Sequence, residues 1–263
     1  MTSAASSSTG ATEHDLALAS TNIGLHGKAI NGESFERNHA KELQQIFTAL
    51  LGGNTECAGL LICEVGNIDD LCSDQGKEKF EACIIQAFQE AGAAEHAKLQ
   101  AGESYNEWVL QSTHKQPQIH WHSTCVAAFI ADLGVQVLPP LQNMHKVDPW
   151  RCTQRFLVRM GDLQNDSWLL VHNTHQPASD NHAFPKGMRI NFCKAVVRDA
   201  TALAKKEPNL IGFVLMGNAN CTHAQWSTAI WEVGTQLWQE GACMQKGVNK
   251  KKTETSRLQW EVM

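Results

Sequence analysis

The sequence predicts one α/β domain with a β-rich middle. Near both ends of the chain, apolar runs typical of buried strands are followed by stripes with helical spacing. Between residues 105 and 160, short β-type runs follow one another too closely for helical crossovers. No linker or internal repeat divides the 263 residues. We expect a flexible tail over residues 1–14, the domain over 15–245, and a polar tail over 246–263.

The N-terminal half opens with two strand candidates separated by a helix. Residues 16–23 and 58–63 are apolar runs with a polar residue at or just after the end, as expected of buried strands. Apolar residues at helical spacing follow each run. The first stripe is Leu43, Ile46, Phe47 and Leu50, and the second is Phe80, Ile84, Ala87, Phe88 and Ala91. The β-rich middle then supplies strand candidates at 108–111, 118–122, 125–130, 135–138 and 155–160.

The C-terminal part alternates strands and helices. A strand is predicted over residues 168–173, and a helix over 186–206 that Pro208 ends. Residues 211–216 form an apolar, partly β-branched run that Gly217 breaks. A last helical stripe follows and is expected to end at Gly241; it consists of Trp226, Ile230, Val233 and Leu237.

Composition excludes several classes of protein. The net charge of -5 argues against a broad basic surface for nucleic acid. Nine dispersed cysteines contain no C-x-x-C pair, which argues against the usual zinc spacing and favours reduced thiols in an intracellular protein, cytoplasmic or nuclear. The N-terminus has no secretory signal pattern, and no apolar run approaches the roughly 18 residues of a membrane span.

Polar side chains stand at the ends of four predicted strands. Asn22 ends the first, Glu64 follows the second, His175 follows the strand over 168–173, and Asn218 and Asn220 follow the strand over 211–216. Ligand and metal sites of α/β proteins gather where strands end. Carboxylate and amide oxygens suit Mg²⁺, and a nearby His and Asn suit a phosphate oxygen.

Each of these residues also has an ordinary structural interpretation. Glu64 fits a solvated or salt-bridged acid, and Asn22 fits a turn former. His175 fits a hydrogen-bonded loop histidine. Arg155, in the strand over 155–160, fits a partner for an acid on the adjacent strand.

The order of these motifs resembles the endonuclease/exonuclease/phosphatase superfamily, the deoxyribonuclease I-like fold. The matching pieces span about residues 16 to 222: Asn22 in ASTNIG, Glu64 in LLICEVG, Arg155 in QRFLVRM, NTHQP at 173–177 and GNAN at 217–220. The resemblance implies two mixed β-sheets packed together with helices outside, a four-layer α/β/β/α sandwich. It also implies hydrolysis of phosphate esters with Mg²⁺ or Mn²⁺.

The resemblance assigns roles to individual residues. Glu64 would be the main metal ligand, with Asn22 assisting. His175, Asn218 and Asn220 would occupy catalytic positions. Arg155 and Asn173 would bind the substrate. That substrate would be a phosphate ester, with nucleic acid among the candidates, and the oligomeric state stays open.

Two departures from the family pattern change the expected activity. The family has Gly-Asp-x-Asn where this chain has Gly-Asn-Ala-Asn, and Asn218 cannot take a proton. The family also ends in Ser-Asp-His, whereas the last histidine here is His223. We therefore expect the closing C-terminal strands to be missing and hydrolysis to be weak or lost. The alternative is a non-catalytic binding domain that retains the fold.

Overall fold

The computed structural model describes residues 16–22, 43–50, 57–65, 74–105, 110, 116–130, 134–141, 152–160, 167–176 and 187–245. Two mixed four-stranded sheets form its centre. The first sheet has the order β1-β2-β4-β3 and the second has the order β5-β6-β7-β8. The strands of the first sheet are β1 (Leu16–Asn22), β2 (Cys57–Cys63), β3 (Gln118–His122) and β4 (Cys125–Phe129). Those of the second are β5 (Val135–Leu138), β6 (Cys152–Met160), β7 (Ser167–His175) and β8 (Leu210–Asn218).

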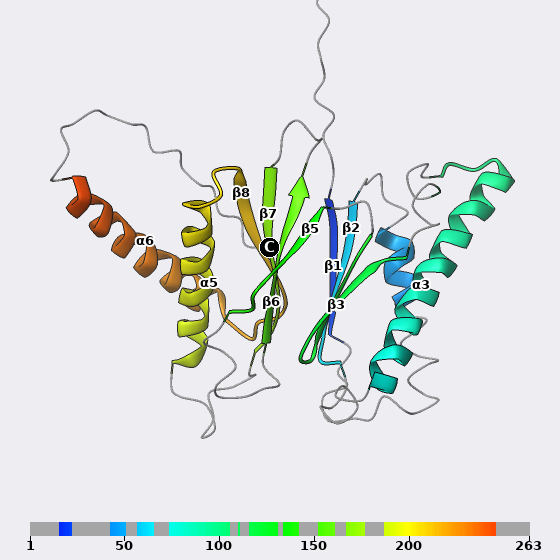
Figure 1. Cartoon of the computed structure of the whole chain (residues 1–263), viewed down its shortest axis with the longest axis horizontal. Helices are drawn as coiled ribbons and strands as arrows, with labels where there is room; N and C mark the ends of the chain where they lie inside the picture. The colour runs from blue at the N-terminus through cyan, green and yellow to red at the C-terminus, as the bar shows by residue number, and fades with distance from the viewer. Residues whose placement is uncertain are drawn as a thin grey trace, which may run out of the picture.

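Helices cover the outer face of each sheet (Figure 1). The helix over residues 43–50 and α3 (Asp74–Ala101) lie outside the first sheet, while α5 (Met188–Ala204) and α6 (His223–Gln245) lie outside the second. The fold is therefore the four-layer α/β/β/α sandwich that the sequence predicted. No helix in the described part of the chain is long and apolar enough to cross a membrane.

The parallel strand pairs decide where the polar strand ends lie. β1 runs parallel to β2, with Asn22 opposite Cys63, the residue before Glu64. β7 runs parallel to β8, with His175 opposite Asn218. Parallel neighbours bring their carboxyl ends to one edge of a sheet. Each sheet therefore carries its polar residues together at one end.

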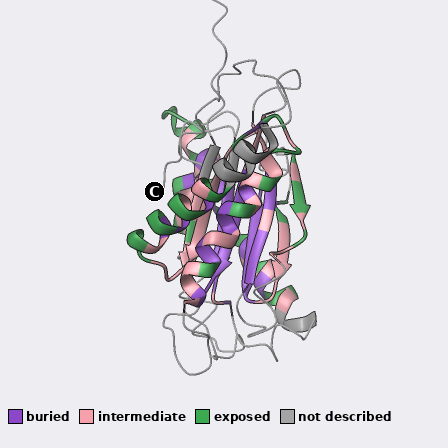
Figure 2. Ribbon diagram, turned by 90° about the vertical axis from the view of Figure 1, so that its left-hand side faces the viewer, coloured by how far each residue is buried: buried purple, intermediate pink, exposed green. Residues whose placement is uncertain are grey.

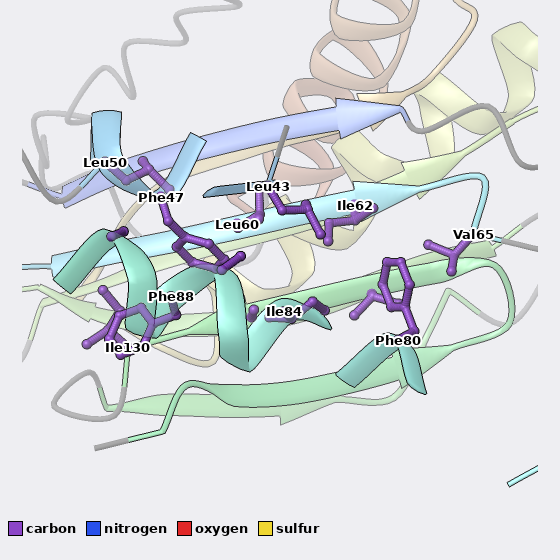
Figure 3. Close-up of a cluster of buried hydrophobic side chains, with 14 residues drawn as sticks. Leu43, Phe47, Leu50, Leu60, Ile62, Val65, Phe80, Ile84, Phe88 and Ile130 are labelled. Atoms are coloured by element: carbon purple, nitrogen blue, oxygen red, sulfur yellow. The ribbon is translucent and has the colours of Figure 1, made fainter. Parts of the chain in front are cut away.

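Apolar side chains fill both the space under the helices and the space between the sheets. The cluster under α3 includes Phe47, Phe80, Phe88 and residues of β2 and β4 (Figure 3). Between the sheets, Phe129 of β4 meets Phe156 of β6 edge to face, with ring centroids 5.0 Å apart. Buried residues occupy the strands at the centre, and exposed residues lie on the outer helix surfaces (Figure 2).

Most predicted elements appear within a few residues of their expected bounds. One strand prediction is wrong where the structure tests it: in the run 108–111, Leu110 is helical, and the other three residues lie outside the described part. α6 continues to Gln245, past Gly241, because a glycine costs a helix only about 1 kcal/mol. The expected tails over 1–14 and 246–263 also lie outside the described residues.

We predict that Phe156→Ala destabilises the protein by about 3–5 kcal/mol, because it removes a fully buried ring from the contact between the sheets. Urea denaturation measures the change in free energy of unfolding. Val137→Ala is the control, since Val137 is 52% exposed on β5 and should shift stability by about 0.5 kcal/mol or less. Equal losses for the two variants would contradict the placement of Phe156.

Candidate functional site

Glu64 is the centre of the polar cluster at the strand ends. It directly follows β2 and has a left-handed backbone, with φ of 60°. Its Oε1 atom lies 2.9 Å from Asn218 Nδ2 and 2.9 Å from His175 Nε2. The side chain of Asn22 also hydrogen-bonds the carboxylate. Two donors thus come from the second sheet and one from the first.

These partners keep Glu64 ionised. Partial burial pushes its pKa upward, but hydrogen bonds from Asn22 and Asn218, together with the charge and hydrogen bond of His175, lower the pKa below its usual value. The side chain of Glu64 is 17% exposed. A carboxylate that is charged and still reaches solvent can bind a cation or accept a proton.

His175 is held on both sides of its ring. The residue is 1% exposed, so the imidazole lies inside the sandwich with Nε2 toward Glu64. Its Nδ1 atom lies 3.2 Å from the hydroxyl oxygen of Thr124. The backbone carbonyl of Thr124 accepts the N–H of Val65 at 3.1 Å, and Val65 directly follows Glu64. The histidine and the carboxylate are therefore tied to each other through two routes.

The segment after β8 places Asn218 and Asn220. Gly217 has φ of 92°, and a Cβ atom there would lie 2.3 Å from the carbonyl oxygen of Thr174, so the position requires glycine. The Asn218 carbonyl accepts the Gln176 N–H at 2.8 Å, and Asn220 Nδ2 donates to the Gln176 carbonyl at 2.7 Å. Both asparagines are thus anchored on the residue that follows His175.

Asn173 lies inside the sandwich, behind the strand ends. It is fully buried, and its Nδ2 atom lies within hydrogen-bond distance of the carbonyl oxygens of Ile62 at 3.2 Å and Val126 at 3.1 Å. It also donates to Gln154 Oε1 at 2.8 Å. These contacts join β7 to β2 and β4. Asn173 thus connects the two sheets, and one of its contacts is with Ile62, two residues before Glu64 in the chain.

Arg155 lies on the opposite face of the second sheet from His175. It pairs with His172 in the ladder, three residues before His175, and side chains alternate along a strand. Its Nε and Nη2 atoms donate to Asp199 of α5 at 2.8 and 2.6 Å. The structure does not bring Arg155 together with Glu64. Its acid partner comes from a helix, and not from an adjacent strand.

Three buried cysteines adjoin the polar cluster, namely Cys63, Cys125 and Cys152. Burial is the main cause that raises the pKa of Cys63 to about 12, and burial also raises the pKa of Cys125. A thiol with such a pKa stays protonated at neutral pH and is a poor nucleophile. Cys63 and Cys125 are therefore poor nucleophiles beside the carboxylate, the imidazole and the amides of the site.

The donor set fits a hard divalent cation with one carboxylate ligand. Asn218 donates its N–H to Glu64, which leaves Oδ1 as an oxygen ligand. Mg²⁺ takes few protein ligands and keeps several waters. Within the described residues, no group of three or more His, Cys, Asp or Glu side chains is arranged for a metal. A single carboxylate with amide oxygens and waters would hold such an ion weakly.

Two residues of the site, Gln176 and Thr124, were not predicted from the sequence. Gln176 lies in the NTHQP motif, where it was expected to have no role, yet its backbone anchors both asparagines. Thr124 lies 51 positions from His175, in the turn between β3 and β4, and no pattern in the sequence marked it. Five of the predicted site residues do lie together: Asn22, Glu64, His175, Asn218 and Asn220.

Neither a known protein-family model nor a curated protein sequence matches this chain.

We predict that the stabilising effect of Glu64 depends on pH. Because its pKa is lower in the folded protein, this stabilisation is present above about pH 5 and is lost as the pH falls through the folded pKa. Urea denaturation of wild type and Glu64→Gln should show a gap in unfolding free energy that narrows between neutral pH and pH 3. Glu103→Gln, at an exposed position, controls for removal of a charge. A gap that widens on acidification would contradict the lowered pKa.

We predict that Arg155→Met destabilises the protein by about 2–3 kcal/mol, since it removes the two hydrogen bonds to Asp199 and the one to the Pro139 carbonyl and leaves Asp199 without its cation. Arg198→Met is the matched control, because its side chain is exposed and makes a hydrogen bond of 3.4 Å to Gln236. Thermal and urea unfolding measure both variants. A stable Arg155→Met protein would show that the pair with Asp199 contributes nothing.

Proposed function

We propose that this chain is a phosphate-ester hydrolase of the endonuclease/exonuclease/phosphatase type, dependent on Mg²⁺ or Mn²⁺ and slow in turnover. One observation carries the proposal: an ionised, partly exposed carboxylate receives N–H groups from strand ends of both sheets. An unrelated solvated acid would not need donors from three separate strands. The assignment to this superfamily rests on the motif order together with this convergence.

The bound cation would be held by Glu64, with Asn22 and Asn218 supplying amide oxygens. When bound, such an ion stabilises negative charge on a phosphate oxygen. The chain's own residues supply binding and orientation. Asn220 uses one of its two amide hydrogens on the Gln176 carbonyl and keeps the other for a phosphate oxygen. His175 donates its Nε2–H to Glu64 and so orients the carboxylate.

Slow turnover follows from the chemistry of Asn218. Its amide donates to Glu64 at 2.9 Å and has no ionisable proton, so it cannot act as a general acid or base. A positioned acid or base typically contributes about 10² to 10⁴ in rate. With an amide in this place, the site binds and orients a phosphate ester but lacks one means of moving a proton.

The same observation favours a second candidate, a non-catalytic domain that binds a phosphate ester. The hydrogen bond from Asn218 to Glu64 is one that an ionised aspartate could not make, because two carboxylates would repel each other. In a site that only holds its ligand, this hydrogen bond keeps Glu64 in place.

The net charge of -5 argues against nucleic acid held by a broad basic surface. The six cysteines whose side chains the structure describes are free thiols, which supports an intracellular location, cytoplasmic or nuclear.

We predict slow, metal-dependent cleavage of a generic phosphodiester that disappears in Glu64→Ala. Bis(p-nitrophenyl) phosphate with Mg²⁺ or Mn²⁺ is the substrate, and release of p-nitrophenolate is the measurement. Asn218→Asp should raise the rate by no more than about tenfold, because residues that act as a unit do not contribute independently. Glu103→Gln, at an exposed position, should leave the rate unchanged. Equal rates for wild type and Glu64→Ala would refute the proposal that the chain is a hydrolase. A paramagnetic titration with Mn²⁺ would then test the alternative, a non-catalytic binding domain.

A further inference from the structure

The hydroxyl of Thr124 faces the imidazole of His175 from the side opposite Glu64. Thr124 Oγ1 lies 3.2 Å from Nδ1, while Glu64 Oε1 lies 2.9 Å from Nε2. Thr124 has no exposed surface, and His175 is 1% exposed. Both ring nitrogens therefore have a partner inside the protein.

The chemistry of the three groups fixes which nitrogen carries hydrogen. An ionised carboxylate only accepts, so Nε2 must donate to Glu64. A neutral imidazole then has a lone pair on Nδ1, to which the Thr124 hydroxyl donates. A protonated imidazole has Nδ1–H, which the same hydroxyl accepts. The threonine satisfies Nδ1 in either state without any movement of the ring.

Thr124 is itself held in place by the backbone around Glu64. Its carbonyl accepts the N–H of Val65 at 3.1 Å. The preceding residue, Ser123, has a left-handed backbone with φ of 51°, which shapes the turn between β3 and β4. The hydroxyl thus sits on a short turn that is bonded to the segment carrying the carboxylate. Such a partner restrains the ring more tightly than a mobile side chain would.

We propose that Thr124 is a positioning residue that orients the His175 ring so that Nε2–H points at Glu64. Its catalytic consequence rests on the proposed function. In that reaction His175 donates Nε2–H to the Glu64 carboxylate and holds it in place, and it is not the group that accepts a proton from water. Thr124 reaches the reaction only through His175.

Imidazole ¹⁵N spectroscopy of the full chain at neutral pH tests the orientation without any substrate. The signals of His175 are assigned with His175→Gln. Wild type and Thr124→Ser should show one set of signals, with hydrogen on Nε2. Two variants lack the hydroxyl: Thr124→Val keeps the size of threonine, and Thr124→Ala differs from serine by the hydroxyl alone. In both variants, the His175 ¹⁵N signals should no longer form the single set with hydrogen on Nε2. Either folded variant suffices for the comparison.

Turnover provides the second readout. The hydroxyl-free variants should lose about fivefold in kcat, the rate equivalent of one neutral hydrogen bond, with KM within about twofold of wild type. Thr124→Ser should restore the rate. Thr201→Val is the control, because the Thr201 hydroxyl bonds the Val197 carbonyl within α5.

The wild-type ¹⁵N pattern in Thr124→Val or Thr124→Ala would overturn the inference, as would its loss in Thr124→Ser. A wild type without turnover would refute the proposed function, yet the spectra would still decide the role of Thr124.

Discussion

A charged carboxylate between two packed sheets needs hydrogen-bond donors, and this requirement organises the polar end of the molecule. Glu64 leaves the first sheet, and two of its partners, His175 and Asn218, end strands of the second. Removing a donor would leave the charge under-compensated in a partly buried place, where lost hydrogen bonds cost most. The carboxylate therefore couples the relative placement of the sheets to the geometry of the site.

The layer of polar side chains behind the carboxylate reinforces this coupling. Asn173 reaches across from β7 to carbonyl oxygens of β2 and β4. Within the second sheet, the buried hydroxyls of Thr153 and Thr174 lie 2.8 Å apart, and Gln176 Nε2 donates to Thr174 at 3.0 Å. Apolar packing such as that of Phe129 on Phe156 tolerates small shifts between sheets. Directional bonds do not, so they fix the register that the site needs.

The sequence allowed the strand ends to be predicted as a site because a simple geometric rule connects them. Buried runs ending in Asn22 and just before Glu64 indicate strands, and parallel pairing then brings their ends together. The face on which a side chain lies does not follow from such a run. Arg155 and Asn173 were both expected at the substrate. One faces α5 and the other faces the opposite sheet, because alternation along β6 and β7 depends on a register that only pairing defines.

Strain in the backbone marks the same site independently of the motifs. Among the described residues, the non-glycine positions with positive φ are Glu64, Ser123 and Asn220, at 60°, 51° and 49°. A left-handed conformation costs such residues roughly 1–3 kcal/mol each, a cost that glycine would avoid. Glu64 and Asn220 carry side chains whose hydrogen bonds define the cluster, and Ser123 precedes the threonine that contacts His175. A fold selected for stability alone would favour glycine at these turns. The strained backbone at these residues supports the binding role that we propose for the cluster.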